Sequence, residues 1–236
     1  MKVFVILPIL KHEAYEEITL KELSRVASKD MEIHVESLEK GPASIESAYD
    51  EALAVPGILE LVRKAETQGF DAVIIDCMGD PGLEAAREIA SIPVVGPCQA
   101  SMAIASTIAS RFSVVTILKN VVPLFHDLTL KYGVAEKIAS VRTIEVPVLD
   151  LEKRWNEVKE ALAREGREAV EKDGAEAIIL GCTGMIGMAE ELRDILKVPV
   201  VDPAPAALLV AEALVRLKLS QSRIKYPTPP EKVRKL

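Results

Sequence analysis

Two cysteines have matching surroundings in the two halves of the sequence. Cys77 lies just beyond the apolar run Val73–Ile75, and Cys182 lies just beyond the apolar run Ile178–Leu180. A thiol can accept a proton when it is ionised and donate one when it is not. Two thiols that face one carbon from opposite sides could therefore remove a proton beside a carbonyl group and return one on the other face. Such a pair would invert a stereocentre without a cofactor.

Glycines surround both cysteines, at Gly79, Gly82, Gly181 and Gly184. Glycine permits tight turns and a close approach of the backbone to a ligand. A helix is expected to begin after each cysteine, so that its first amides favour a thiolate and a bound carbonyl. The same amides would lower the thiol pKa from its usual value of about 8.5 and stabilise an enolate.

The two cysteine segments belong to an internal repeat. Further matching pairs are Ile92–Pro97 with Val198–Pro203, Glu32–Val35 with Thr143–Val146, and Val3–Leu7 with Val114–Leu118. The order strand, helix, strand, helix, strand, cysteine, helix, strand therefore occurs twice. Because ligands bind at the carboxyl ends of strands in open parallel sheets, the repeat predicts that both thiols enter one cleft.

Short, β-branched apolar runs predict parallel strands that are buried on both faces. They are Val3–Leu7, Ala72–Ile75, Val94–Val95, Val114–Leu118, Ala177–Leu180 and Val200–Val201, with more exposed candidates at Glu32–Leu38 and Thr143–Leu149. Helices are expected at Tyr15–Ser28, Ala48–Thr67, Leu83–Ala90, Leu151–Lys172 and Ala189–Leu196. The segment after Leu219 is expected to be a loose surface tail.

Strands that alternate with helices predict an α/β fold. We expect two pseudo-symmetric Rossmann-like (flavodoxin-like) lobes, each a short parallel sheet flanked by helices, with the site in the cleft between them. The first lobe would comprise residues 1–97 plus 206–236 and carry Cys77. The second would comprise residues 98–205 and carry Cys182.

Composition narrows the function classes. A formal net charge of −7 with no basic block argues against a nucleic-acid partner, and the apolar runs are too short to span a membrane. Acidic residues near the start argue against a signal peptide, and three cysteines form no disulfide framework, so a reducing cytoplasm is expected. The three histidines lack metal-ligand spacing, and no nucleotide-binding motif occurs. We therefore expect a homo-oligomeric protein that acts on a small molecule without a metal or cofactor.

The sequence resembles the hydantoin racemase branch of the aspartate/glutamate racemase superfamily over nearly its whole length. The matching segments are Gly41–Ser47, Tyr49–Ala52, Cys77–Leu83, Arg111–Thr116 and Leu180–Met185. The resemblance implies two Rossmann-like halves with the site between them. It also implies cofactor-independent racemisation, with Cys77 and Cys182 as the two bases.

Comparison with other branches narrows the expected substrate. Amino-acid racemases of the superfamily have Asn-Thr after the first cysteine, and this chain has Met78-Gly79 there. A neutral ring such as a 5-substituted hydantoin or allantoin therefore fits better than a free amino acid. The related decarboxylases retain one of the two cysteines, and this chain has both. One departure is Ile9, which follows Pro8 where the family usually has an asparagine that contacts substrate.

The residues expected to bind substrate are Pro8, Ile9, Ser44, Met78, Gly79, Asp80, Thr116, Thr183 and Gly184. Some have simpler interpretations. Asp80 before a proline favours a helix N-cap over direct contact with substrate. Ser44 and Ser47 precede a helix, and either could cap it. Cys98 is interpreted as a packing residue because its repeat partner is an alanine.

Two other functions stay open from the residues alone. One is an aspartate-type amino-acid racemase or an isomerase that uses one thiol as a covalent nucleophile. The other is a non-catalytic, two-lobed protein that binds a small molecule, which the apolar Ile9 favours and the paired cysteines disfavour.

Overall fold

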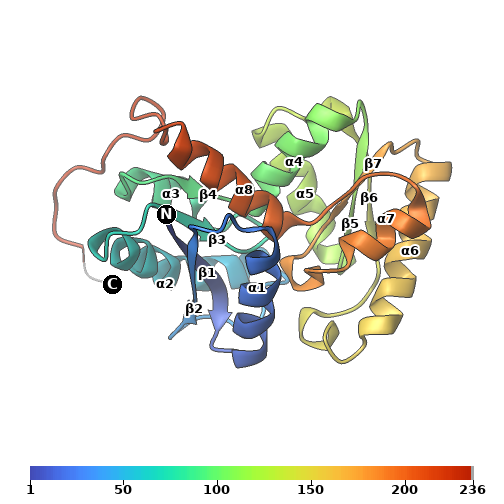
Figure 1. The fold of residues 1–236 in the computed structure, drawn as a ribbon, viewed down its shortest axis with the longest axis horizontal. Coiled ribbons are helices and arrows are strands. Elements are labelled where there is room, and N and C mark those ends of the chain that lie inside the picture. Colours follow the sequence, from blue (N-terminus) through green and yellow to red (C-terminus); the bar gives the residue numbers. More distant parts are fainter. Residues whose placement is uncertain (235–236) are drawn as a thin grey trace. The chain divides into compact units, whose positions relative to one another are not determined.

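The computed structural model, which describes residues 1–234, contains two parallel sheets of four strands (Figure 1). The first sheet has the order β2-β1-β3-β4, with β1 (Lys2–Leu10), β2 (Glu32–Leu38), β3 (Ala72–Ile75) and β4 (Val94–Val95). The second has the order β6-β5-β7-β8, with β5 (Phe112–Thr116), β6 (Ile138–Thr143), β7 (Ala177–Leu180) and β8 (Val200–Val201). Helices flank both sheets, which confirms the expected α/β class with two Rossmann-like sheets.

The helices are α1 (Glu13–Val26), α2 (Ala48–Thr67), α3 (Leu83–Ile89), α4 (Pro97–Ile108), α5 (Val122–Lys131), α6 (Trp155–Glu171), α7 (Ala189–Leu196) and α8 (Pro203–Arg216). Short 3-10 turns are η1 (Lys119–Val121), η2 (Ala135–Lys137), η3 (Val148–Asp150) and η4 (Thr183–Met185). The sequence predicts five of the helices, and it places α2 and α7 at their observed bounds. It misses α4, α5 and α8. α4 and α8 are rich in apolar residues and contain few charged side chains, which mark the exposed face of the helices that the sequence does predict.

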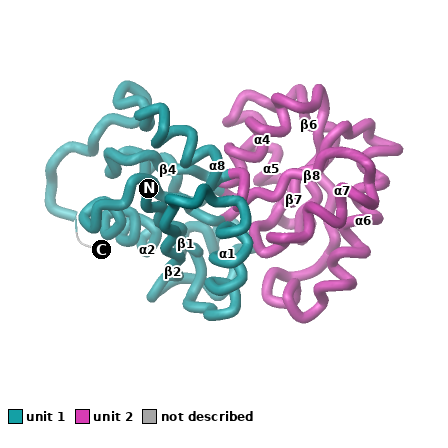
Figure 2. Tube along the Cα trace, viewed as in Figure 1, with its two compact units in different colours: residues 1–76, 80–96, 207–236 teal, residues 77–79, 97–206 magenta. Residues whose placement is uncertain are grey.

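The chain divides into two compact units (Figure 2). Unit 1 comprises residues 1–76, residues 80–96 and the chain from Ala207 onward, and unit 2 comprises residues 77–79 and 97–206. The last two residues of the expected first lobe, 235–236, lie outside the described residues. Each unit contains one of the two sheets.

Each sheet carries its own apolar core. β3 and β7 are completely buried, which explains why both read as uninterrupted apolar runs. In unit 1 the core includes Phe4, Ile58 and Ile75. In unit 2 the core is built around Phe112, Phe125 and the strand β7. Cys98 is fully buried in this second core, so its interpretation as a packing residue is confirmed.

The second strand of the second sheet lies upstream of its expected place. The sequence predicts Thr143–Leu149, and the structure has β6 at Ile138–Thr143. Ile144, Val146 and Val148 alternate like a strand because they are buried, but Ile144 and Val146 belong to an irregular segment that follows β6, and Val148 begins η3. β6 itself is partly buried throughout, as expected for an edge strand, and therefore gives a weak apolar signal.

The repeat also has a different register from the one expected. β1 pairs Ile6 with Ile75, and β5 pairs Val115 with Leu180. Val3–Leu7 therefore corresponds to Phe112–Thr116 rather than to Val114–Leu118. The sequence aligned these strands two residues out of place, because both alternatives are apolar and only strand pairing separates them.

The C-terminal segment is not loose over its whole length. Gln221 and Arg223 donate side-chain hydrogen bonds to backbone carbonyls of residues 87–92 in unit 1. The expectation of a loose surface tail is therefore wrong for this part of the chain. Proline and charge in the segment gave a tail-like composition, and the contacts that hold it are with residues more than a hundred positions away.

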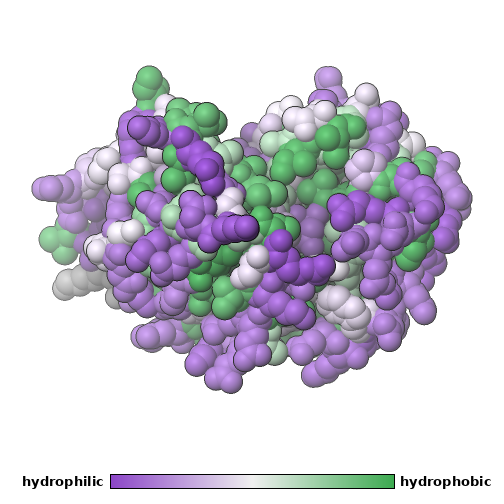
Figure 3. Space-filling view, viewed as in Figure 1, coloured by the Kyte–Doolittle hydropathy of each residue, from purple (hydrophilic) through white to green (hydrophobic). Residues whose placement is uncertain are grey.

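Hydrophilic side chains cover most of the face shown in Figure 3. This agrees with the 28% of charged residues in the sequence. Within residues 1–234, no helix combines the length and apolar character that crossing a bilayer requires.

A buried carboxylate fastens α8 to the end of α1. Glu212 is 8% exposed, and it accepts hydrogen bonds from Ser28 Oγ and from Arg216 Nε. The Ser28 hydroxyl, followed by the Arg216 guanidinium, lowers the pKa of Glu212 below its usual value. A lowered folded-state pKa means that the carboxylate stabilises the fold at neutral pH.

We predict that Glu212→Gln lowers the free energy of unfolding at pH 7 by about 1 kcal/mol, because the charged acceptor is lost. The difference from the unmodified protein should shrink as the pH falls below about 4.5 and through the lowered pKa, since protonation removes the same charge. Chemical denaturation at pH 7 and at pH 4 measures both values. An equal difference at the two pH values would contradict the prediction.

Candidate active site

Each sheet has one point where its strand order reverses. In unit 1 this point lies between β1 and β3, and in unit 2 it lies between β5 and β7. Ligands of open parallel sheets bind beyond the carboxyl ends of the strands at such points. Cys77 lies two residues beyond β3, and Cys182 lies two residues beyond β7. The two thiols therefore follow equivalent strands, each at the position that the topology favours for a ligand.

Cys77 lies in a tight loop that follows β3. It is partly buried, and the backbone N–H of Gly79 donates to its Sγ at 3.5 Å. An amide that donates to sulfur favours the thiolate over the thiol. The segment Cys77–Gly79 belongs to unit 2, as Cys182 does. Met78 is buried in the apolar core of unit 2, so its side chain anchors the segment there.

Cys182 is held by close packing behind it. Gly181 lies so near Thr116 that an added Cβ would be 2.5 Å from the Thr116 Cβ. The Thr116 hydroxyl donates to the Gly181 carbonyl at 3.0 Å, and Thr116 is fully buried. Cys182 then leads into η4, where Met185 N–H donates to its carbonyl at 3.1 Å. Thr183 and Gly184 lie at the start of this turn and are partly buried.

The expected helices α3 and α7 do follow the cysteines, but neither begins directly after its cysteine. Residues 78–82 separate Cys77 from α3, and residues 183–188 separate Cys182 from α7. The donor that reaches Cys77 is the loop amide of Gly79.

Asp80 does not cap α3. The helix is preceded by Gly82 in the left-handed conformation, with no capping side chain. Asp80 itself has a φ of 48°, is 4% exposed, and lies with its carboxyl group against Gly96. A Cβ at position 96 would be 2.4 Å from the Asp80 Cγ, so only glycine fits there. The loop after β3 and the end of β4 thus hold each other in place.

Pro8 and Ile9 form an irregularity near the end of β1. Leu7 pairs with Ser37 and Leu10 pairs with Leu38, so the two residues are extra in β1. Such bulges are frequent next to active sites, where they redirect side chains. Pro8 is buried and Ile9 is partly exposed.

The two serines in the loop before α2 have different roles. Ser47 caps α2, because its Oγ accepts from Asp50 N–H at 3.2 Å and donates to the Asp50 carboxylate at 2.7 Å. Ser44 does not cap the helix and is partly buried. The loop is tied to the end of β1, since Leu10 N–H donates to the Pro42 carbonyl at 2.8 Å. Ser44 thus lies in a loop fastened near Ile9.

Asp76, Gly96 and Asp202 shape the loops around the two cysteines, but the sequence alone does not mark them as functional residues. Asp76 directly precedes Cys77 and is 4% exposed. Gly96 contacts Asp80, and its repeat counterpart Asp202 accepts from Gly187 N–H at 2.8 Å. The match of Ile92–Pro97 with Val198–Pro203 already pairs Gly96 with Asp202. A glycine in one half and an aspartate in the other half was the sequence feature that could have drawn attention to both positions.

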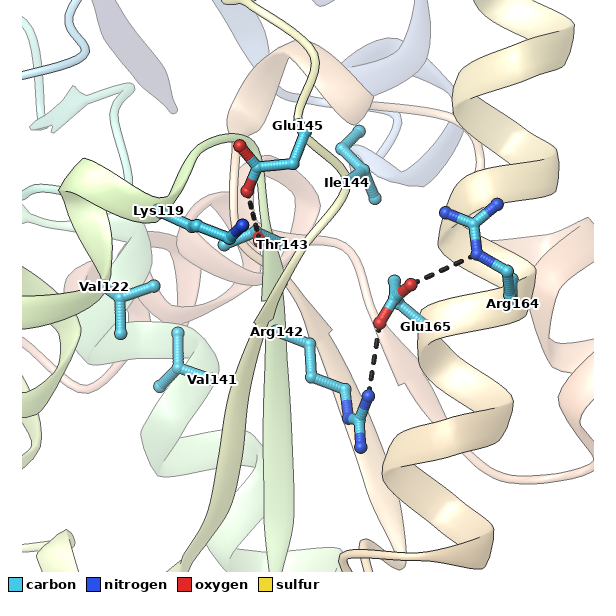
Figure 4. Close-up of a pocket in the computed structure, with 9 residues that line it drawn as sticks. All are labelled: Lys119, Val122, Val141, Arg142, Thr143, Ile144, Glu145, Arg164 and Glu165. Atoms are coloured by element: carbon cyan, nitrogen blue, oxygen red, sulfur yellow. Dashed lines mark hydrogen bonds and ion pairs between the residues drawn. The ribbon is translucent and has the colours of Figure 1, made fainter.

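A separate cavity of about 530 Å³ lies at the edge strand β6 (Figure 4). Arg142 binds Asp173 through two hydrogen bonds, at 2.6 and 3.1 Å, and it also contacts Glu165. Asp173 raises the pKa of Arg142, and Arg142 lowers the pKa of Asp173. None of the residues predicted to bind substrate lines this cavity. Arg142 and Arg164 in its lining both form ion pairs with Glu165, as in a structural ion-pair network.

Among residues 1–234, no three His, Cys, Asp or Glu side chains gather in a way that could hold a metal ion. All three cysteines are thiols and form no disulfide.

Comparison with known proteins gives a consistent result. A model of the family described as Asp/Glu/Hydantoin racemase matches residues 13–211. A hydantoin racemase from Pseudomonas sp. (strain NS671) is 45% identical over 206 residues, which cover 87% of this chain and 83% of that protein. A hydantoin racemase from Rhizobium meliloti is 46% identical over 183 residues, which cover 78% and 76%.

Solved structures resemble the whole chain. An allantoin racemase from Klebsiella pneumoniae has a TM-score of 0.95 and 37% sequence identity, and the match covers 100% of this chain and 96% of that one. An allantoin racemase from Pseudomonas fluorescens has the same TM-score and identity, with both chains fully covered. Arylmalonate decarboxylase, with a TM-score of 0.64 and 16% identity, shares the fold alone.

We predict that Gly96→Ala lowers the free energy of unfolding by about 1–3 kcal/mol, because the new methyl group meets the buried Asp80 carboxyl. Asp80→Gly removes that carboxyl and suits the left-handed backbone. The double variant should therefore lose clearly less stability than the sum of the two single variants. Denaturant titration of all four proteins gives the coupling energy, and strictly additive losses would contradict the Asp80–Gly96 contact.

Proposed function

Because the chain belongs to the Asp/Glu/Hydantoin racemase family, and is therefore an isomerase, we propose that it racemises a hydantoin-type ring by proton transfer between Cys77 and Cys182. The ring is a 5-substituted hydantoin or allantoin. One observation carries the proposal: the two thiols follow equivalent strands, β3 and β7, of two sheets with the same strand order.

The proposed reaction needs two proton transfers. The thiolate of one cysteine takes the proton from the ring carbon beside the carbonyl, and the electron pair of that C–H bond moves into the carbonyl as an enolate. The thiol of the other cysteine then gives its proton to the opposite face of the carbon. The opposite enantiomer reacts with the roles of the cysteines exchanged. Each thiol has to be both acid and base, which requires a pKa near the working pH.

The surrounding residues are suited to this task. Gly79 N–H donates to Cys77 and supports its thiolate state. The backbone amides of Thr183 and Gly184, at the start of η4, are proposed donors to the ring carbonyl and to the enolate. Ser44, in the loop tied to β1, is a proposed contact to the rest of the ring. Buried Thr116 and Met78 would act by positioning the cysteine segments rather than by touching substrate.

The substrate class rests on two kinds of similarity. Relatives at 42–46% identity carry the description hydantoin racemase, and structures at a TM-score of 0.95 are allantoin racemases. Hydantoin and allantoin share a ring in which the stereogenic carbon lies beside a carbonyl, so its proton can be removed as the enolate forms. Proton transfer of this type uses no cofactor, and we propose that the protein works without one, in the cytoplasm and as a homo-oligomer.

We predict that Cys77→Ser and Cys182→Ser each lower the racemisation rate by about 10²–10⁴-fold, because each removes one of two obligatory proton carriers. Polarimetry of an L- or D-5-substituted hydantoin measures the rate. Each variant should still exchange solvent deuterium into one enantiomer, since the remaining thiol can remove and return a proton on its own face.

Cys98→Ala is the matched control, because Cys98 is buried in the unit 2 core and takes no part in the proposed reaction. It should racemise at a rate close to that of the unmodified protein. If either Cys77→Ser or Cys182→Ser keeps near-normal turnover, the two-base mechanism fails. A stable covalent adduct on one cysteine, seen by mass spectrometry of the trapped enzyme, would instead support nucleophilic catalysis.

The substrate class has its own test. We expect a higher kcat/KM for 5-substituted hydantoins or for allantoin than for free aspartate or glutamate, which the site is not expected to turn over. Polarimetry with each compound at several concentrations gives the comparison. Faster racemisation of aspartate would contradict the proposed ring substrate and leave the two-thiol chemistry standing.

A further inference from the structure

The C-terminal strap, defined as residues 221–226, binds the edge strand β4 of the first sheet and the residues just before it. The side-chain amide of Gln221 donates to the carbonyls of Ala90 at 2.7 Å and Ile92 at 3.0 Å, and its oxygen accepts from Val94 N–H at 3.3 Å. The amide group therefore binds the first residue of β4 and the segment that leads into it from α3. The family match ends at residue 211, so the strap lies beyond it.

The strap also closes the end of α3. The Arg223 guanidinium donates to the carbonyls of Arg87 at 3.1 Å and Glu88 at 3.3 Å, and it also donates to the carbonyl of Ala90. The last carbonyls of a helix lack partners within the helix, and a cation there interacts favourably with the helix dipole. Arg223 supplies both the donors and the charge.

Arg87 links α3, β4 and the strap. Its Nε donates to the Val94 carbonyl at 3.0 Å, and its Nη1 donates to the Tyr226 hydroxyl at 3.1 Å. Its guanidinium also lies over the Tyr226 ring, 5.4 Å from the centroid. One side chain of α3 thereby binds both β4 and the strap.

The hydrogen bonds of the strap hold α3 and β4, two short elements that form few hydrogen bonds of their own. α3 has seven residues and β4 has two, and elements this short depend on outside contacts for their stability. Both elements border Asp80. Leu83 N–H at the start of α3 donates to the Asp80 carbonyl at 3.2 Å, and Gly96 after β4 supports the Asp80 carboxyl. Asp80 follows directly on Gly79, whose amide donates to the Cys77 sulfur.

We propose that the C-terminal strap is a positioning element for Cys77, because it fixes α3 and β4 and through them the loop Cys77–Asp80. The proposal deepens the proposed function, since it assigns to residues far along the chain the control of one of the two thiols. In this proposal Gln221 and Arg223 touch no reacting atom and act only through the α3–β4 corner, which comprises α3, residues 90–93 and β4.

The repeat provides an internal comparison. The corresponding helix α7 ends at Lys197, whose backbone is left-handed with φ of 59° and whose N–H donates to the Arg193 carbonyl at 2.9 Å. α7 therefore ends through its own backbone. In the described chain, the hydrogen bonds of Gln221 and Arg223 go to residues 87–94 and to Tyr226, all in unit 1. Residues 87–94 belong to α3, β4 and the segment between them, and these elements border Asp80, which directly follows the Cys77–Gly79 segment of unit 2. We therefore expect the strap to affect Cys77 and to leave Cys182 unchanged.

The first test needs no turnover. The full chain carrying Gln221→Ala and Arg223→Ala is treated with iodoacetamide, and peptide mass spectrometry follows alkylation of each cysteine with time. We expect the rate at Cys77 to rise about fivefold, because its loop opens more often, and the rate at Cys182 to stay the same. Arg234→Ala is the matched control, since within residues 1–234 its hydrogen bonds go to the carbonyls of Pro230 and Lys232, and it should change neither rate. Arg223→Lys, which keeps the charge, should lie in between.

An unchanged or slower rate at Cys77, or an equal rise at both cysteines, would overturn the proposal, because either result means that the strap has no selective effect on the Cys77 loop. The second test uses deuterium exchange into a hydantoin. Adding Gln221→Ala and Arg223→Ala should slow exchange about fivefold in the Cys182→Ser variant, where only Cys77 acts. The same two changes should leave exchange unchanged in the Cys77→Ser variant. Absence of exchange in both backgrounds, with the strap intact, would refute the proposed function, and the alkylation ratio would still decide on the strap.

Discussion

Two backbone hydrogen bonds of equal length determine where the thiols lie. Asp76 N–H donates to the Ile6 carbonyl, and Gly181 N–H donates to the Val115 carbonyl, both at 2.8 Å. Each bond fixes the residue just before a cysteine to the central strand of its own sheet. Because the strands on both sides are buried and parallel, they cannot slip without moving their apolar side chains out of the core. The chemistry proposed for Cys77 and Cys182 depends on this shared register.

Beyond that register the two halves use different means to hold their cysteines. Around Cys77 a strained Asp80 fits against Gly96, and a loop amide reaches the sulfur. Behind Cys182 a buried Thr116 binds the Gly181 carbonyl with no space for a side chain. The two thiols therefore have equivalent positions relative to their sheets but different surroundings.

The chain also returns to its beginning to complete unit 1. α8 from Ala207 onward belongs to this unit, and Glu212 fastens it to Ser28 at the end of α1. The strap continues to the α3–β4 corner through Gln221 and Arg223. The last part of the sequence thus stabilises the first sheet at both the α1 and the α3 helices. A segment whose composition resembles a tail owes its order to backbone carbonyls at short, weakly stabilised elements.

The sequence by itself determined the alternating strands and helices, the repeat and the pair of cysteines beyond β3 and β7. Those features follow from local apolar patterns and from residue type, which a single chain displays directly. The tertiary structure decided that β6 precedes the buried residues Ile144, Val146 and Val148. It also decided that Gly82 rather than Asp80 occupies the cap position of α3, and that the side chains of Gln221 and Arg223 bind backbone carbonyls of unit 1. Each of these depends on contacts between residues far apart in the chain. Local pattern cannot distinguish a buried loop from a strand or a bound side chain from a solvated one, because the neighbour that decides the matter is not nearby in sequence.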